Sequence, residues 1–122
     1  MKQEIIMFNN IKTPITYYIG SNKSDNFKIL DYVKETDIWF HIFDCSSCHV
    51  VVSIPEKEQE LLTKKQVMTI IKRGALLCRQ YTNKVKKEKN VEVIYTQVKN
   101  ITKLQEEGSV LAKNTKIYTL TD

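Results

Sequence analysis

Residues 38–52, IWFHIFDCSSCHVVV, decide the fold. Two runs rich in aromatic and β-branched residues, 38–43 and 49–54, flank a polar connection at 44–48. Runs of this kind are typical of strands, and a short polar connection between two of them predicts a β-hairpin. Pro55 closes the second run, because proline lacks the amide N–H that a strand needs. The sequence therefore predicts an antiparallel pair of strands with a polar tip.

The tip contains Cys45-Ser46-Ser47-Cys48-His49, which has the C-x-x-C-H spacing that attaches c-type haem. That chemistry requires an exported chain, whereas residues 1–10 hold only a short apolar stretch and no secretory signal. Three cysteines are odd in number and too few for a disulfide framework, as expected for thiols kept reduced inside a cell. We therefore expect a cytoplasmic protein that carries no haem and no other cofactor.

The cysteines of the tip allow two further interpretations. Because a hairpin can bring His41 opposite His49, these histidines could bind zinc together with Cys45 and Cys48, or the two thiols could form a redox switch. The favoured interpretation is that the cysteines fill small spaces near the tip, because free cysteine behaves as a small apolar residue. We expect no metal site.

Two elements are predicted before the hairpin. Residues 15–19 are rich in β-branched and aromatic side chains and end at Gly20-Ser21-Asn22, which predicts a strand followed by a turn. Residues 24–34 place apolar side chains at helical spacing. Ser24 or Asp25 could cap this short helix.

A long helix is predicted from Thr63 to Tyr81. Thr63-Lys64-Lys65-Gln66 matches the capping box, in which two side chains bond the free backbone donors of a helix start. Six residues fall on one side of a helical wheel: Val67, Met68, Ile71, Gly74, Ala75 and Cys78. Several of them are small, so we expect close packing against the sheet.

The remaining elements complete the fold class. Residues 91–95 and 116–120 read as strands, and Gly108-Ser109 marks a turn between them. The pattern predicts a single compact α+β domain over residues 1–122, with a mainly antiparallel sheet packed against one long and one short helix. We expect the two ends of the chain to be loosely held.

Positive charge is concentrated in one segment. The net charge is +5, but residues 57–90 carry ten basic residues against three acidic ones, or +7, and the remainder carries nine against eleven, or −2. Such asymmetry is typical of a protein that binds a polyanion. Nucleic acid is the first candidate for this polyanion, and an anionic membrane surface is the second. The alternative is a solvated lysine-rich face without a partner.

The hairpin also carries a family signature. Asp37-Ile38-Trp39-Phe40-His41, followed by Ser47-Cys48-His49-Val50-Val51, resembles the D-x-W-F-H…S-H-V-x-x pattern of the NFACT-R domain. That domain is the C-terminal RNA-binding module of ribosome quality-control factors. The resemblance covers nearly the whole chain, through Tyr18-Ile19-Gly20, Asn26, Leu30, Val93-Ile94-Tyr95-Thr96 and Lys103 to Val110. The serine-rich turn of this chain, at Ser46-Ser47-Cys48-His49, is most similar to the turn in the stand-alone branch of the family.

The resemblance implies six signature positions with a role in binding: Asn26, Asp37, Trp39, His41, Ser47 and His49. Two histidines beside carboxylates could act as acid and base on an RNA phosphodiester. The favoured interpretation is that they make buried hydrogen bonds that fix the hairpin, because the resemblance implies binding rather than turnover. Trp39 likewise suits a buried anchor better than an exposed platform for a base. We assign no catalytic residue.

The sequence thus predicts a nucleic-acid-binding module that favours RNA over DNA and leaves DNA open as a partner. The resemblance links it to tRNA, rRNA or translation quality control. Nine residues are predicted to contact phosphates: Lys64, Lys65, Lys72, Arg73, Arg79, Lys84, Lys86, Lys87 and Lys89. Contacts of this kind give affinity with little sequence specificity. Two alternatives remain open at this point. One is a metal-independent RNA-processing enzyme, and the other is a module that docks on a protein or an anionic membrane.

Overall fold

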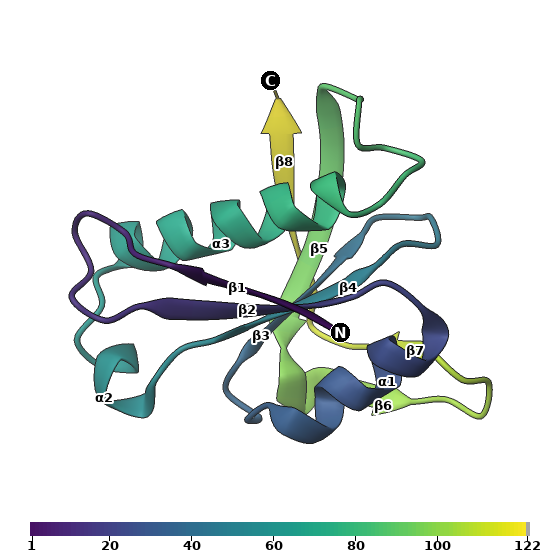
Figure 1. Cartoon of the computed structure of the whole chain (residues 1–122), viewed down its shortest axis with the longest axis horizontal. Coiled ribbons are helices and arrows are strands. Elements are labelled where there is room, and N and C mark those ends of the chain that lie inside the picture. Colours follow the sequence, from purple (N-terminus) through teal and green to yellow (C-terminus); the bar gives the residue numbers. More distant parts are fainter. Residues whose placement is uncertain (122) are drawn as a thin grey trace.

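The predicted hairpin forms the middle of a six-stranded antiparallel sheet (Figure 1). In the computed structural model, which describes residues 1–121, β3 (Ile38–Ile42) pairs with β4 (His49–Ser53), with Phe40 opposite Val50. The strand order is β1-β2-β4-β3-β5-β8. The flanking strands are β1 (Lys2–Ile6), β2 (Ile15–Gly20), β5 (Asn90–Gln97) and β8 (Lys116–Thr121). The predicted hairpin is therefore confirmed.

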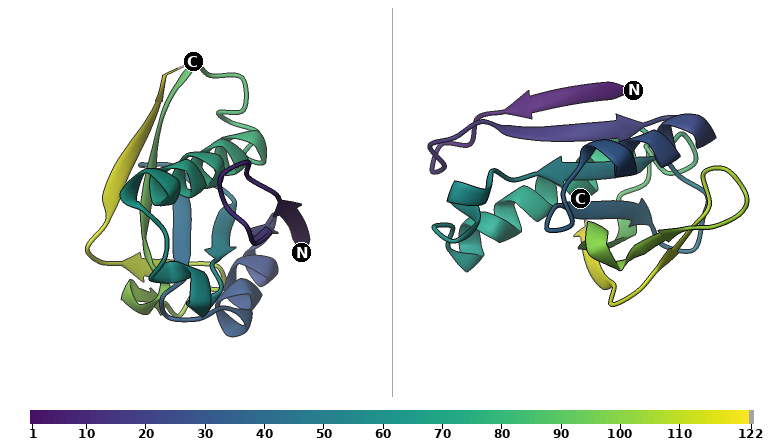
Figure 2. Two further views of the ribbon diagram at one scale, coloured as in Figure 1. Left: turned by 90° about the vertical axis from the view of Figure 1, so that its left-hand side faces the viewer. Right: turned by 90° about the horizontal axis from the view of Figure 1, so that it is seen from below.

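Separate layers cover the two faces of the sheet (Figure 2). The long helix α3 (Lys64–Gln80) lies on one face. The other face carries α1 (Lys23–Tyr32) and a two-stranded sheet of β6 (Ile101–Lys103) and β7 (Val110–Ala112). Two short elements complete the chain, α2 (Glu56–Gln59) and the 3-10 turn η1 (Val98–Asn100). The predicted α+β class is confirmed.

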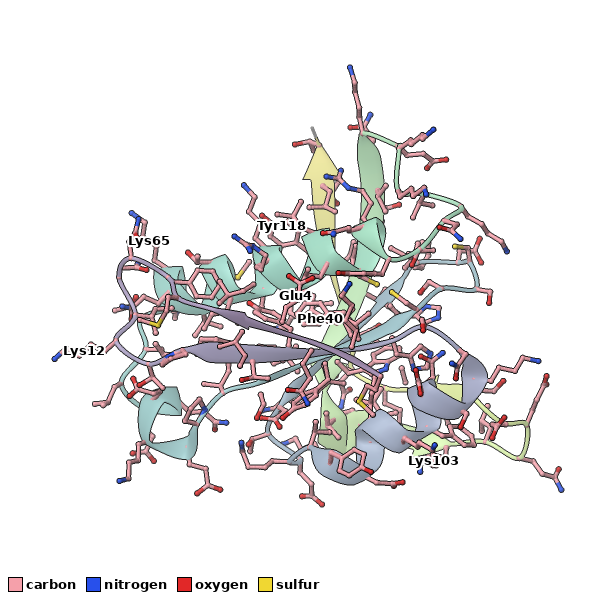
Figure 3. All side chains as sticks on the ribbon, in the orientation of Figure 1. Glu4, Lys12, Phe40, Lys65, Lys103 and Tyr118 are labelled. Carbon is pink, nitrogen blue, oxygen red and sulfur yellow. The ribbon has the colours of Figure 1, made fainter. Side chains whose placement is uncertain are left out.

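The start and the packing of α3 follow its sequence. Thr63 Oγ1 accepts a hydrogen bond from the Gln66 N–H at 3.2 Å, and Gln66 Oε1 accepts one from the Thr63 N–H at 2.8 Å, so the capping box is present. Phe40 lies next to α3 (Figure 3). Gly74 lies directly on the ring of Phe40, where a Cβ atom would overlap the ring. The small residue therefore sets the distance between helix and sheet.

Two details of the helices differ from the prediction. The buried face of α3 includes Ile70 and Leu77, which the wheel left out, whereas Met68 is 42% exposed. The cap of α1 is Asn22, whose side chain accepts a hydrogen bond from the Asp25 N–H at 2.8 Å, in place of Ser24 or Asp25. Asn22 is the last residue of the predicted turn, and its side chain satisfies a free amide of the first helical turn.

The expectation of loosely held chain ends is wrong. β1 pairs with β2 along its full length, from Lys2 opposite Ile19 to Ile6 opposite Ile15. Glu4 adds a tie to the end of α3, because its carboxylate accepts a hydrogen bond of 2.6 Å from the Tyr81 hydroxyl. At the other end of the chain, β8 pairs with β5. Charged side chains on the edge strand β1 masked its pattern, as is usual for strands at the edge of a sheet.

Candidate nucleic-acid interface

The alternation of β3 sends its side chains to opposite faces of the sheet. Phe40 and Ile42 point into the core under α3, whereas Trp39 packs with Ile29 of α1 and Val51 on the other face. Successive side chains of a strand alternate in this way, so His41 lies on the same side as Trp39. Trp39 and His41 of the signature therefore lie on the face that α3 does not cover, whereas Phe40 faces α3.

Trp39, His41 and His49 form a compact ring cluster on that face. The His41 ring stacks on Trp39 with a centroid distance of 5.5 Å and an angle of 15°, and His49 meets both rings edge-on at 5.4 and 5.1 Å. The Trp39 indole donates a hydrogen bond to Nδ1 of His49 at 3.3 Å. Trp39 is 2% exposed and His49 is 3% exposed, while His41 is half-buried. Trp39 is thus a buried anchor, as the sequence favoured.

Burial favours the neutral form of both imidazoles. It lowers the pKa of His49 from 6.5 to about 3, with a further contribution from the neighbouring His41. Burial also lowers the pKa of His41, although the Ile42 carbonyl opposes this change. A general acid that works at neutral pH needs a pKa near 7. The geometry therefore gives little support to the acid–base interpretation of this pair.

Asp37 is fully buried and organises the backbone around β3. Its Oδ2 accepts a hydrogen bond from the Lys34 N–H at 2.8 Å, and its Oδ1 accepts one from the Ile54 N–H at 3.3 Å. The Lys34 ammonium lies 3.3 Å from the same carboxylate. This first residue of the signature therefore joins the end of α1 to the end of β4.

Asn26 and Ser47 hold the hairpin from its two sides. Asn26 is buried, and its Oδ1 accepts a hydrogen bond from the His49 N–H at 3.3 Å. It also lies against Gly20, where a Cβ atom would meet its side chain. Ser47 Oγ accepts a hydrogen bond from the Ile42 N–H at 3.1 Å and so closes the tip. Both residues position the histidines.

A pocket of about 770 Å³ opens beside the ring cluster, and we call it the histidine pocket. Trp39, His41 and His49 form one side, and the β6–β7 hairpin with its turn forms the other. Sequence analysis missed this second wall, because β6 and β7 have three residues each and are too short to show an alternating pattern. The signals for it were the predicted turn at Gly108-Ser109 and the family resemblance from Lys103 to Val110.

The two thiols of the tip lie apart, because Cys45 lines the histidine pocket and Cys48 does not. Cys48 is buried in the core under α3, where its Sγ lies 4.0 Å from Sγ of Cys78, on the opposite face from the ring cluster. Within residues 1–121, no group of three or more His, Cys, Asp or Glu side chains has a geometry that could hold a metal ion. The burial of Cys48 agrees with the interpretation that it fills a small space.

The predicted phosphate contacts fall into two groups. The two arginines are half-buried: the Arg73 guanidinium lies 5.8 Å from the centre of the Phe8 ring, and Arg79 donates to the carbonyls of Glu88 and Lys89 at 3.3 and 3.4 Å. Arg79 therefore orders the loop that follows α3. The lysines form an exposed group that we call the basic surface: Lys64, Lys65 and Lys72 on α3, and Lys84, Lys86, Lys87 and Lys89 in the loop.

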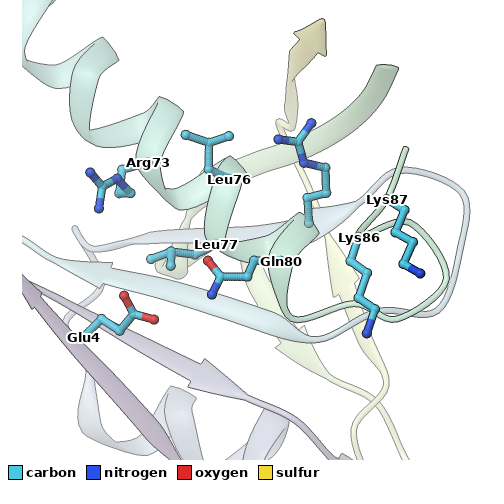
Figure 4. Close-up of a pocket in the computed structure, with 8 residues that line it drawn as sticks. Glu4, Arg73, Leu76, Leu77, Gln80, Lys86 and Lys87 are labelled. Carbon is cyan, nitrogen blue, oxygen red and sulfur yellow. The ribbon is translucent and has the colours of Figure 1, made fainter. Parts of the chain in front are cut away.

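Next to the basic surface, a pocket of about 620 Å³ lies between β1, the C-terminal half of α3 and the loop (Figure 4). Arg73, Lys86 and Lys87 line it together with Glu4. Arg79 also lines this pocket, so four cations face one carboxylate among its described lining residues. An anion such as a phosphate suits this environment.

Proteins of similar sequence and structure are known. A coiled-coil domain-containing protein 25 homolog from Dictyostelium discoideum is 29% identical over 113 residues, 90% of this chain and 53% of that protein. Coiled-coil domain-containing protein 25 from Mus musculus is 33% identical over 89 residues, 72% and 41% of the two chains. The chain thus spans about half the length of the curated relatives it matches. The C-terminal structure of the fibronectin/fibrinogen-binding protein from Streptococcus suis shows the same fold, with a TM-score of 0.71 and 23% identity over 88% of this chain and 41% of that one.

An antiparallel α+β domain with a lysine-rich helix and loop has the features of a nucleic-acid-binding module. The chain belongs to the NFACT-R family, because the family model described as the NFACT protein RNA binding domain matches residues 5–117. The resemblance stated from the sequence is confirmed, including its likeness to the stand-alone branch. Membership of this family supports the binding of nucleic acid, and of RNA in general. Within residues 1–121, no helix is long and apolar enough to cross a membrane.

Proposed function

We propose that this chain binds RNA through the basic surface, in a setting linked to tRNA, the ribosome or translation quality control. One observation carries the proposal: seven exposed lysines lie on α3 and the loop that follows it, and two of them, Lys86 and Lys87, line a pocket together with Arg73. The setting is carried over from the family resemblance that the hairpin signature carries. The chain spans about half the length of the curated relatives it matches, so the setting goes beyond what those relatives show.

The form of the basic surface suits phosphates more than base edges. Lys65 and Lys72 lie seven residues apart on α3, or roughly 10 Å along the helix axis, so they can reach separate phosphates. Flexible lysines act as point charges and adapt to different backbones. Binding should therefore be tight at low salt and should differ little between sequences.

The test replaces Lys65, Lys72 and Lys87 together by glutamine. Three exposed lysines outside the surface, Lys28, Lys113 and Lys116, receive the same change as a matched control for net charge. For the surface variant we expect weaker binding to unrelated single-stranded RNAs, and a slope of log affinity against log salt that is shallower by roughly 0.7 for each lost contact. Thermal melting checks that both variants stay folded.

Two outcomes contradict the proposal. One is a folded surface variant that keeps the affinity and the salt slope of the parent chain. The other is a control variant that loses as much affinity as the surface variant, which would assign the effect to net charge alone. Crosslinking in cells, with sequencing of the captured RNA, then decides between tRNA and rRNA as the partner.

A further inference from the structure

The histidine pocket combines flat apolar walls with a polar edge. Ile94, Val110 and Ala112 line it beside the ring cluster, and the half-buried His41 already stacks on Trp39. A third planar ring on the open side of His41 would continue that stack. Small-molecule sites are typically built in this way, from apolar walls and a few placed polar groups.

The hydrogen bonds of the two histidines fix which ring nitrogens carry protons. Nδ1 of His41 lies 2.6 Å from the Ile42 carbonyl, which can only accept, so Nδ1 is protonated and Nε2 is left as an acceptor. Nδ1 of His49 accepts from the Trp39 indole, so the neutral ring carries its proton on Nε2 and donates there. The cluster therefore offers one acceptor and one donor side by side, with the ring centroids 5.1 Å apart.

A second groove, of about 330 Å³, adjoins the histidine pocket at the hairpin tip; we call it the tip groove. Lys23, Asn26, Ser46 and Ser47 line both spaces, so the two are continuous. The tip groove leads to the loop that carries the basic surface, because Lys84 also lines it. In Figure 1 the hairpin tip and this loop lie at the same end of the molecule.

The two spaces differ in charge. The histidine pocket is lined by Asp44, Glu106 and Glu107 against Lys23, which disfavours a phosphate there. The tip groove is lined by Lys23 and Lys84, and none of its described lining residues carries a carboxylate. The exposed Lys23 ammonium also lies 3.9 Å from the Glu106 carboxylate, which an incoming phosphate would have to displace. A ligand that spans both spaces should therefore be neutral at one end and anionic at the other, as a nucleotide is.

We propose that the histidine pocket holds one unpaired nucleobase of a bound RNA, stacked on His41, while the adjacent phosphate lies in the tip groove between Lys23 and Lys84. His41 Nε2 accepts from an N–H of the base edge, and His49 Nε2–H donates to a ring nitrogen or carbonyl oxygen. Every nucleobase presents such a donor beside an acceptor on its Watson–Crick edge. This inference rests on the proposed RNA-binding function and adds a base contact to the phosphate contacts of the basic surface.

The first test uses the unaltered protein and two probes of equal length, a ten-nucleotide single-stranded RNA and its abasic analogue with the same backbone. Trp39 is the one tryptophan of the chain and lies at the pocket, so its fluorescence reports entry of a base. We expect the base-bearing probe to bind about tenfold more tightly than the abasic probe. It should also quench Trp39, while the abasic probe binds without quenching.

Two His41 variants test the contact itself. His41→Asn keeps a donor at the position of Nδ1 for the Ile42 carbonyl but lacks the outer acceptor, whereas His41→Gln places an amide oxygen near the position of Nε2. Both lose the ring. We expect His41→Asn to lose the preference for the base-bearing probe and His41→Gln to regain part of it. Binding of the abasic probe and its salt slope should stay at the level of the parent chain in both variants.

The outcomes separate this inference from the proposed function. Equal affinity of the parent chain for both probes, or binding of the base-bearing probe without a change in Trp39 fluorescence, overturns the base pocket and leaves the basic surface in place. A folded His41→Asn variant with unchanged preference overturns it as well. If the parent chain binds neither probe at low salt, the RNA-binding function and the base pocket are both overturned.

Discussion

His49 shows how a single buried residue couples the fold to pH. Its ring is 3% exposed and accepts a hydrogen bond from Trp39, an arrangement that only the neutral imidazole can make. In the unfolded chain the same ring titrates near its ordinary pKa of about 6.5. Between that value and the folded pKa of about 3, the unfolded state binds more protons than the folded state. Stability therefore falls as the pH falls below about 6.5.

The resulting prediction concerns unfolding at two pH values. From pH 7 to pH 5 the free energy of unfolding should drop by about 2 kcal/mol through His49, because one pKa unit corresponds to about 1.4 kcal/mol. The lowered pKa of His41 acts in the same direction. Urea denaturation at both pH values measures the drop. His49→Asn retains an acceptor for the Trp39 indole and should show a smaller drop. An equal drop in both proteins would remove His49 as the cause.

Asp37 is the second residue whose environment leads to a clear prediction. Asp37→Ala leaves the Lys34 and Ile54 amides without their acceptor in a buried site, and each unsatisfied donor costs about 1 to 3 kcal/mol. We expect a loss of about 3 kcal/mol in urea denaturation. Asp31→Ala serves as the control, because the Asp31 side chain is 64% exposed and its ion pair with Lys103 should contribute at most about 1 kcal/mol. Similar losses in both variants would contradict the structural role of Asp37.

At the level of elements, the contact between α3 and the sheet depends on Gly74. Gly74→Ala raises helix propensity by about 1 kcal/mol, but the added methyl group overlaps the Phe40 ring in a packed core. Overpacking of this kind typically costs about 1 to 3 kcal/mol, so we expect a net loss of stability. Thermal melting of Gly74→Ala, Phe40→Leu and the double variant measures the coupling. If the double variant loses the sum of the two single losses, the proposed overlap is wrong.

Elements with a strong periodic pattern could be predicted from the sequence, and short ones could not. The hairpin and α3 have apolar residues at the spacing of a strand and of a helix, together with turn and cap residues at their ends. β6 and β7 are too short for a pattern, and β1 has polar side chains along an exposed edge. The signature histidines could be found in the sequence. The pocket beside them could not, because its second wall comes from β6 and β7.

In the whole molecule, the larger apolar core and the ring cluster lie on opposite faces of the sheet. α3 covers one face with the larger apolar core, and its outer side carries part of the basic surface. The other face displays the ring cluster, which α1 and the β6–β7 hairpin enclose only in part. The hairpin tip and the loop after α3 bring the ring cluster and the basic surface together at one end of the molecule (Figure 1). A single strand of RNA could therefore follow a continuous path from the loop to the histidine pocket.

β1 covers the edge of β2, and we expect it to protect the sheet from association. β2 is mostly buried, and it reads Ile-Thr-Tyr-Tyr-Ile-Gly without a charged residue, whereas β1 carries Lys2 and Glu4 along the edge. Removal of residues 1–8 would expose the free N–H and C=O groups of β2 and turn an apolar strand into the edge of the sheet. We expect the shortened chain to associate as its concentration rises, as measured by light scattering.

A control separates the loss of the edge strand from a general loss of stability. Asp37→Ala in the full chain should lower the stability while β1 stays in place, so it should scatter less than the shortened chain at the same fraction unfolded. A shortened chain that stays monomeric across the same concentrations would contradict the protective role of β1. In that case the Tyr81–Glu4 hydrogen bond and the pairing with β2 would serve only to hold the chain end.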